Sequence, residues 1–228
     1  MRKYLIYGAL FLCMGLLLSS CSKDDDPKAS ELAGTWKVKE HNPQKGQYAM
    51  NVVWEAPNDV TLEMMGQKFP ANGLSAYLTP MMSTLIKNAL KDVTLTTDGK
   101  VKSTVFKKKS KEWVTVDGYV TYKDEGNGRL RLFFDVDKTL EGSSLDAQSL
   151  TQIKAALKNG VPMRYTINGN SARFYFDTET IKSMRAYLPI IFSMAGNMPS
   201  NVLESLKTGL PNVIEKSTKI EFAVNMER

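Results

Sequence analysis

Few side chains in this chain could do chemistry. The sequence holds one histidine, His41, and two cysteines, Cys13 and Cys21. His41 stands beside Asn42-Pro43 at the end of an alternating run, which is typical of an exposed loop residue rather than a metal ligand. The inventory therefore predicts no metal site of the histidine or thiolate type. The sequence contains no glycine-rich phosphate loop and no nucleophile elbow, so we expect no cofactor and no enzymatic activity.

One group of charged residues could form a carboxylate site. Arg129, Arg131, Asp135 and Asp137 are separated by even numbers of residues, and on a single strand their side chains would share one face. Charged residues that pair across a solvated sheet face give the same pattern, and we favour that interpretation. The predicted role of these residues is therefore structural.

Cys21 has the clearest predicted chemistry. It ends an apolar run that begins at Leu5 and is too short and badly flanked to be a stable membrane span. Leu18-Ser19-Ser20-Cys21 resembles the lipobox of bacterial lipoproteins, in which the signal peptide is cut before the cysteine and the cysteine is lipidated. The resemblance implies a lipid such as palmitate on Cys21 and a lipid-anchored protein of the cell envelope. The alternative is an ordinary secretory signal with an incidental cysteine.

A polar segment separates Cys21 from the first predicted strand. Residues 21–31 include Asp24-Asp25-Asp26 and no apolar residue large enough to pack, which predicts a flexible acidic tether. The acidic run also resembles the export signal that Bacteroidetes lipoproteins use to reach the outside of the outer membrane; a generic solvated linker explains it equally well. The predicted organisation is a signal peptide over 1–20, the tether over 21–31 and a single domain over 32–228.

The net charge argues against a nucleic-acid partner. The formal charge of +6 falls to +4 when Arg2 and Lys3 leave with the signal peptide, because 28 basic residues then face 24 acidic ones. The segment from Phe106 to Lys111 carries four lysines. We interpret them as protection of a hairpin tip or sheet edge, with contact to an anionic lipopolysaccharide or polysaccharide as the alternative.

The predicted domain opens with a strand-like alternation around Trp36 and Val38. Gly34-Thr35-Trp36 resembles the G-x-W that opens the first strand of lipocalins and other calycin-like barrels, where the tryptophan plugs one end of the barrel. The resemblance implies structural roles for Gly34 and Trp36. Many Bacteroidetes-type lipoproteins of unknown function share such a lipocalin-like opening, and this chain looks like one of them.

Turn signals divide the rest of the domain into hairpins. Asp98-Gly99, Glu125 to Gly128 and Asn168-Gly169 each separate two alternating runs. A last alternating run covers Ile220 to Met226. The predicted fold class is mainly β (α+β): an antiparallel meander that closes into a lipocalin-like barrel or stacks into a sandwich.

Three helical insertions are predicted to pack on this meander, at about residues 73–91, 146–158 and 178–216. In the first, apolar residues recur at three- and four-residue spacing, and a break is predicted at Pro80 with Thr79 capping a new start. The third is predicted to fall into pieces, divided at Pro189, around Gly196 to Pro199 and at Gly209 to Pro211.

The predicted ligand site is apolar. Ten of the twelve methionines follow Cys21, and seven of these belong to the first and third helical regions or their approaches. Methionine is flexible and polarizable, so a surface rich in it can repack around different apolar ligands. The residues predicted to form a lid over one barrel mouth and to bind the ligand are Met64, Tyr77, Met81, Met82, Met184, Tyr187, Phe192 and Met194. Plain packing of helix on sheet is the alternative.

The sequence leaves two functions open. In the first, the protein binds a small apolar or amphipathic molecule in a helix-capped barrel. In the second, it is a non-catalytic interaction module for another envelope protein or a glycan. A dry cavity under the methionines would favour the first, and a filled interior with a large exposed apolar patch would favour the second. The membrane, through the lipid on Cys21, is the other expected partner.

Overall fold

The structure is a computed structural model of the chain. It describes residues 31–64, 66–107, 110–141, 145–188, 190 and 200–228. The predicted signal peptide, Cys21 and the tether up to residue 30 lie outside the described residues.

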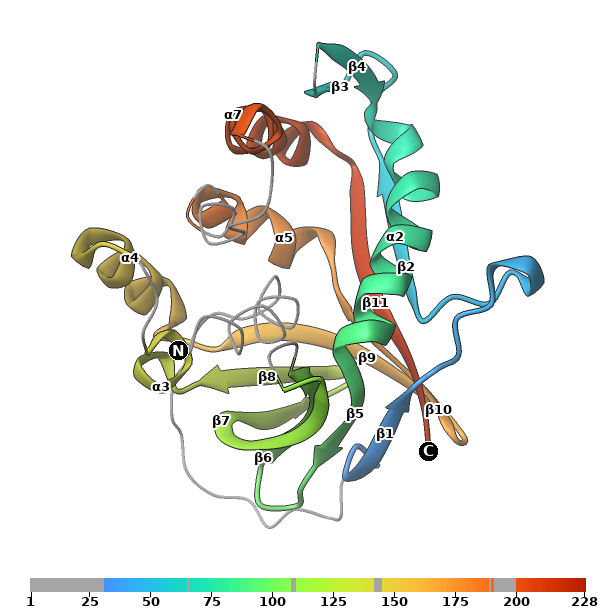
Figure 1. The fold of residues 1–228 in the computed structure, drawn as a ribbon, viewed down its shortest axis with the longest axis vertical. Helices are drawn as coiled ribbons and strands as arrows, with labels where there is room; N and C mark the ends of the chain where they lie inside the picture. Colours follow the sequence, from blue (N-terminus) through green and yellow to red (C-terminus); the bar gives the residue numbers. More distant parts are fainter. Residues whose placement is uncertain (1–30, 65, 108–109, 142–144, 189, 191–199) are drawn as a thin grey trace.

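Within the described residues, eight antiparallel strands close into a barrel (Figure 1). In order around the barrel they are β1 (Gly34–Val38), β5 (Leu90–Leu95), β6 (Lys100–Lys107), β7 (Glu112–Gly126), β8 (Arg129–Phe134), β9 (Val161–Asn168), β10 (Ser171–Phe176) and β11 (Lys219–Glu227). The barrel closes because β11 pairs with β1 at Lys37↔Glu227 and Val38↔Met226. The predicted meander is confirmed, and of its two predicted outcomes it forms the barrel.

One further strand extends the barrel wall on one side. β2 (Met50–Glu55) pairs with β11 from Met50↔Val224 to Glu55↔Lys219, on the same edge of β11 that β1 occupies further along. β2 and β11 therefore leave the barrel together as a ribbon (Figure 1). Beyond this ribbon, β3 (Thr61–Met64) and β4 (Gln67–Pro70) form a separate two-stranded sheet.

Helix α2 (Leu74–Ala89) covers the outer edge of β2 through a ladder of hydroxyl groups. Each hydroxyl accepts a hydrogen bond from a backbone N–H of β2 and donates one to the carbonyl of the same residue. The pairs are Ser83 with Met50, Thr79 with Val52 and Ser75 with Trp54, at N···O distances of 2.8, 3.0 and 2.6 Å. The register holds because four helical residues rise about 6 Å and two strand residues about 6.8 Å. This hydroxyl ladder (Ser75, Thr79, Ser83) satisfies an edge that would otherwise lack partners.

Two predicted helix breaks are wrong. α2 runs unbroken through Pro80, and Thr79 bonds the backbone of β2 instead of capping a new helix. α7 (Ser200–Lys216) likewise runs through Gly209 and Pro211. Packing explains why both helices continue, since tertiary contacts can hold a helical turn that proline weakens. Gly209 is needed for close approach: a Cβ there would lie 3.0 Å from Leu62 Cδ1 of β3.

The other helices begin at aspartates. Asp135, Asp146 and Asp177 each accept a hydrogen bond from the backbone N–H three residues further on, which satisfies a donor that the helix leaves free. The helices that follow are α3 (Val136–Leu140), α4 (Ala147–Leu157) and α5 (Thr178–Met184), and short 3-10 turns lie at η1 (Pro43–Lys45), η2 (Ala71–Gly73) and η3 (Arg185–Tyr187). Helices therefore occupy the described parts of all three predicted insertions, while α3 was not predicted.

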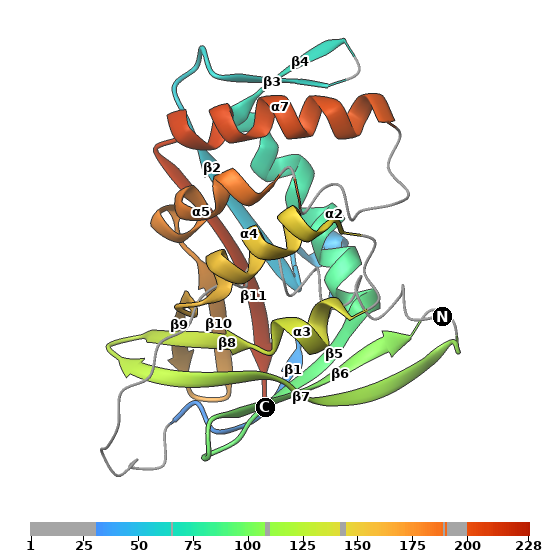
Figure 2. The ribbon, with the colours of Figure 1, turned by 90° about the vertical axis from the view of Figure 1, so that its left-hand side faces the viewer.

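The longer helices gather beside the β2–β11 ribbon, above the barrel in Figure 1. Figure 2 shows α7, α5 and α4 stacked on that side, with β6, β7 and β8 below them. Among the described helices, none is long and apolar enough to cross a membrane.

The first strand is fixed to the last residue of the chain. Trp36 is fully buried, and its indole N–H donates to the carbonyl oxygen of Leu32 at 2.8 Å. The guanidinium of Arg228 lies 4.2 Å from the centre of the Trp36 ring, close enough for a cation–π contact. Gly34 has a φ of +134°, which residues with a side chain rarely adopt, and a Cβ there would also meet Arg228.

Candidate functional site

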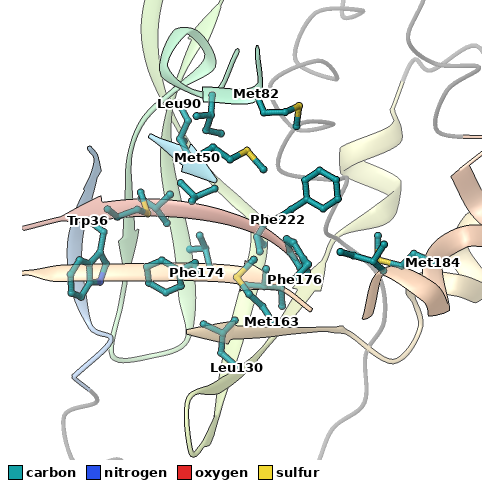
Figure 3. Close-up of a pocket in the computed structure, with 18 of the residues that line it drawn as sticks. Trp36, Met50, Met82, Leu90, Leu130, Met163, Phe174, Phe176, Met184 and Phe222 are labelled. Atoms are coloured by element: carbon teal, nitrogen blue, oxygen red, sulfur yellow. The ribbon is translucent and has the colours of Figure 1, made fainter. Parts of the chain in front are cut away.

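An apolar cavity of about 150 Å³ lies between the barrel interior and the covering helices (Figure 3). The helices contribute Met82 and Ile86 from α2, Ile181 and Met184 from α5, and Leu210 and Ile214 from α7. The barrel contributes residues such as Trp36, Leu130, Met163, Phe174 and Met226. In Figure 3, Trp36 and Met184 lie on opposite sides of the cavity.

Strand periodicity explains why the barrel side of the cavity is apolar. Side chains alternate between the two faces of a strand, so every second residue of β8, β9 and β10 points inward. Leu130 and Leu132 do so from β8, and Phe174 and Phe176 from β10. The polar residues between them, such as Arg131, face outward and form ion pairs there.

The polar atoms of the aromatic lining are already hydrogen-bonded. The indole N–H of Trp36 donates to Leu32 O, and that of Trp54 donates to Ser217 Oγ, both at 2.8 Å. Every other lining side chain in the described part of the chain is a hydrocarbon or a thioether. The side chains of the described lining therefore offer a ligand no free donor, and a polar group placed among them would lose its hydrogen bonds to water without replacement.

The tyrosine that packs on the lining residue Phe174 brings no charge to the cavity. The Tyr165 ring packs against Phe174 with ring centres 6.4 Å apart, and its hydroxyl donates to Asp124 Oδ1 at 3.0 Å. Burial, together with this bond to a carboxylate, raises the pKa of Tyr165 to about 12. The phenol therefore stays neutral at physiological pH.

The structure brings two of the predicted ligand-binding residues together at the cavity. Met82 and Met184 both line it, from α2 and α5. Tyr187 is partly buried against the core without lining the cavity. Met64 lies at the end of β3, and nothing further is described for its side chain. Phe192 and Met194 lie outside the described residues.

Tyr77 and Met81, predicted as ligand-binding residues of the lid, do not line the cavity. Tyr77 is 66% exposed and Met81 41% exposed. The reason is the helical period: Tyr77 and Met81, four residues apart, share one face of α2. The hydroxyl ladder and the cavity-lining Met82 and Ile86 occupy the opposite side. The apolar stripe of α2 is therefore wider than the surface that the helix buries.

The helix-based prediction also missed three methionines on strands. Met50, Met163 and Met226 line the cavity and come from β2, β9 and β11. Their signal was present in the sequence, because each belongs to an alternating run that predicted a strand. With Met82 and Met184, five methionines line the cavity in the described structure.

The charged residues do not form the carboxylate site that their spacing allowed. β8 ends at Phe134, so Asp135 and Asp137 leave the strand; Asp135 caps α3 and Asp137 forms an ion pair with Lys154. Arg131 binds Glu125 through two nitrogens. Within the described residues, no three histidine, cysteine, aspartate or glutamate side chains are grouped so that they could hold a metal ion.

Fold and site together define a class: a closed eight-stranded antiparallel barrel with a helix-covered apolar cavity. This architecture is consistent with the lipocalin-like fold that Gly34-Thr35-Trp36 predicted. Comparison of the chain with protein-family models, with curated proteins and with solved structures gave no match. The functional argument therefore rests on the chemistry of the cavity itself.

Proposed function

We propose that the protein is a non-catalytic binding protein that takes an apolar hydrocarbon chain into its cavity and leaves any polar head group outside. The observation that carries this proposal is the absence of any unpaired polar side-chain group from the described cavity lining. A ligand with a buried hydroxyl or carboxylate would find no partner there. The tail of an amphipathic lipid meets this requirement.

The size of the cavity and the flexibility of its methionine side chains support the same kind of ligand. A dry apolar cavity of about 150 Å³ can bind a molecule such as benzene, whereas typical pockets for larger ligands hold about 300–1,000 Å³. The cavity of this protein is at the small end, which suits a slim chain better than a fused-ring molecule. Its five methionines can change rotamer around chains of different length.

The predicted anchor would place the cavity near its ligands. We propose, from the lipobox resemblance, that Cys21 is lipidated and that the protein faces the periplasm or the cell surface from the outer membrane. Cys21→Ser should abolish incorporation of labelled fatty acid and release the protein from the membrane fraction. Unchanged labelling of this variant would contradict the anchor and leave the cavity proposal untouched.

Uptake of a chain-shaped fluorescent dye, cis-parinaric acid, whose polyene tail fluoresces in apolar surroundings, tests the cavity. Val120 of β7 lines it, so Val120→Phe should fill part of the space and weaken dye binding about tenfold, which corresponds to about 1.4 kcal/mol. Val114→Phe is the matched control, because Val114 belongs to the same strand and is not part of the lining. A wild-type protein that binds no dye, or equal binding by both variants, would favour a packed core.

One observation favours the alternative, an interaction module for another envelope protein. Tyr77, Met81 and Leu85 are exposed at four-residue spacing along α2, which leaves one apolar stripe of the helix uncovered. If this stripe is the functional surface, replacing Tyr77 and Met81 by alanine should abolish co-purification of a partner from the host while dye binding stays intact. Loss of dye binding only on Val120→Phe favours the cavity.

A further inference from the structure

A second surface lies on the outer face of the β6–β7 hairpin. Phe106 and Trp113 stand opposite each other across the two strands, with ring centres 5.3 Å apart and an edge-to-face geometry. Trp113 is 42% exposed, whereas the other two tryptophans, Trp36 and Trp54, are buried. An exposed indole does not stabilise the core, and its apolar ring with one polar N–H suits a boundary between water and lipid.

The hairpin carries this pair beyond the barrel. The last rung between β5 and β6 is Leu90↔Val105, and β8 joins β7 only from Val120 onward. The end of the hairpin, from Phe106 and Lys107 to Glu112 and Trp113, is therefore paired only within itself (Figure 2). It can reach a flat surface that the rest of the barrel does not touch.

Two described lysines, Lys107 and Lys111, lie at the same end, where Glu112 stands opposite Lys107. Lys107 and Lys111 form no ion pair among the described residues, whereas Lys102, five residues before Lys107 on β6, binds Asp117 at 3.1 Å. A lipid head-group region presents an anionic surface and a partly apolar boundary. The ammonium groups can contact the anionic surface, and the exposed indole can enter the apolar boundary.

The backbone at Lys111 gives an independent indication. Lys111 has a φ of +57°, and its N–H donates to Lys107 O at 2.8 Å to close the turn. Glycine or asparagine adopts this left-handed conformation more easily, as Asn127 does in the β7–β8 turn. The turn therefore has a lysine at a position where the backbone conformation favours glycine or asparagine.

We propose that this tip, through Phe106, Lys107, Lys111 and Trp113, binds the head-group region of a bilayer containing anionic phospholipid. The indole enters the interface beside Phe106, and the two ammonium groups contact lipid phosphates. Each lysine near an anionic membrane surface contributes about a fivefold change in affinity. This inference does not depend on the cavity or on lipidation of Cys21.

Vesicle binding tests the inference directly. The protein is prepared from Ser22 to Arg228, which retains every described strand and helix and lacks the predicted lipid site. It is sedimented with vesicles of phosphatidylcholine alone and of an equimolar mixture with phosphatidylglycerol. We expect binding to the anionic vesicles that weakens with salt, together with a blue shift of tryptophan emission, since Trp113 is the exposed tryptophan.

Two variants separate this role from a structural one. Trp113→Ala should remove the emission shift and weaken vesicle binding, while Tyr77→Ala, the removal of another exposed aromatic ring, should change neither. Lys111→Gly should leave the fold at least as stable, because glycine relieves the left-handed backbone, and should weaken vesicle binding about fivefold. Lys216→Gln, on the exposed end of α7, is the charge control.

Three results would overturn the inference. The first is wild-type protein that does not bind the anionic vesicles. The second is binding that Trp113→Ala and Lys111→Gly leave unchanged, as expected if the lysines only discourage strand aggregation. The third is binding to a soluble anionic polysaccharide with no binding to vesicles, which would assign the tip to a glycan. Dye uptake by Trp113→Ala, expected to be unchanged, shows whether the cavity is intact.

Discussion

At the scale of single residues, hydroxyl groups determine where α2 lies. Ser83 is fully buried, and it bonds both the N–H and the carbonyl of Met50 on the edge of β2 that faces α2. A serine in a helix is usually read as a weak helix former. Here it substitutes for a neighbouring strand, and in this way it places Met82 and Ile86 over the cavity.

We predict that Ser83→Ala lowers the free energy of unfolding by about 1–3 kcal/mol, because it leaves a buried backbone donor and acceptor without partners. Urea denaturation measures the loss. Asn88→Ala, an exposed change on the same helix, should alter stability by less than about 0.5 kcal/mol. Equal effects of the two changes would show that the hydroxyl ladder does not hold α2.

Trp36 allows a second comparison between residues of the same type. Trp36→Ala removes a fully buried ring that packs edge-to-face on Phe174 with ring centres 6.1 Å apart, so we expect a loss of about 3–5 kcal/mol. Trp113→Ala removes an exposed ring and should cost less than about 1 kcal/mol. Similar losses for the two variants would contradict the position of Trp36 at the end of the cavity.

At the scale of elements, alternation and turn residues predicted most of the barrel. Asp98-Gly99 and Asn168-Gly169 each connect two paired antiparallel strands, and of the predicted turn from Glu125 to Gly128 the residues Asn127-Gly128 do so, because β7 extends to Gly126. β4 was not predicted because its four residues, Gln67–Pro70, are all exposed and show no apolar alternation. Local rules also failed at Pro80 and Pro211, where packing on the sheet outweighs the local preference for a break.

The site was predicted only in part, for a geometric reason. The apolar stripe of α2 includes Tyr77, Met81 and Met82. Which of these side chains line the cavity depends on how the helix is rotated against β2. Ser75, Thr79 and Ser83 set this rotation through their hydrogen bonds to β2. Their role can be recognised only once the edge of β2 is known to lie opposite them. Met163 and Met226 were predicted as strand residues; their contact with the same cavity depends on barrel closure.

Asp177 caps helix α5, which lines the cavity through Ile181 and Met184. Burial raises the pKa of Asp177, but the backbone N–H of Thr180 and the guanidinium of Arg164 outweigh it, so the pKa is lowered overall. A carboxylate with a lowered folded-state pKa stabilises the fold above the unfolded value, about 3.9, and this contribution is lost as the pH falls through the folded-state pKa.

We therefore predict that Asp177→Ala lowers the stability by about 0.5–2 kcal/mol at neutral pH and by less at an acid pH below the unfolded-state value of about 3.9. Asp177→Asn keeps an oxygen that can cap the helix and should cost less than the alanine variant. Urea denaturation at both pH values measures the effect. A loss that does not depend on pH would show that the charge of Asp177 does not stabilise α5.

At the scale of the whole molecule, closure and the cavity are properties that no local pattern contains. The pairing of Val38 with Met226 joins the two ends of the domain and turns a meander into a barrel, whereas the sequence left a sandwich as the alternative. The cavity depends on how fully the side chains of nine described strands and three described helices fill the space between them. Its apolar character was predictable, whereas its size and boundaries were not.

The central claim, that the cavity takes up a hydrocarbon chain, is tested most directly by nuclear magnetic resonance of methyl-labelled methionine during titration with a long-chain alcohol. We predict that the methyl signals of the five lining methionines, Met50, Met82, Met163, Met184 and Met226, shift together and saturate. Met81, which is exposed on the far side of α2, should stay in place and serves as the internal control. No shift of the five signals, or a shift of Met81 alone, would contradict the claim.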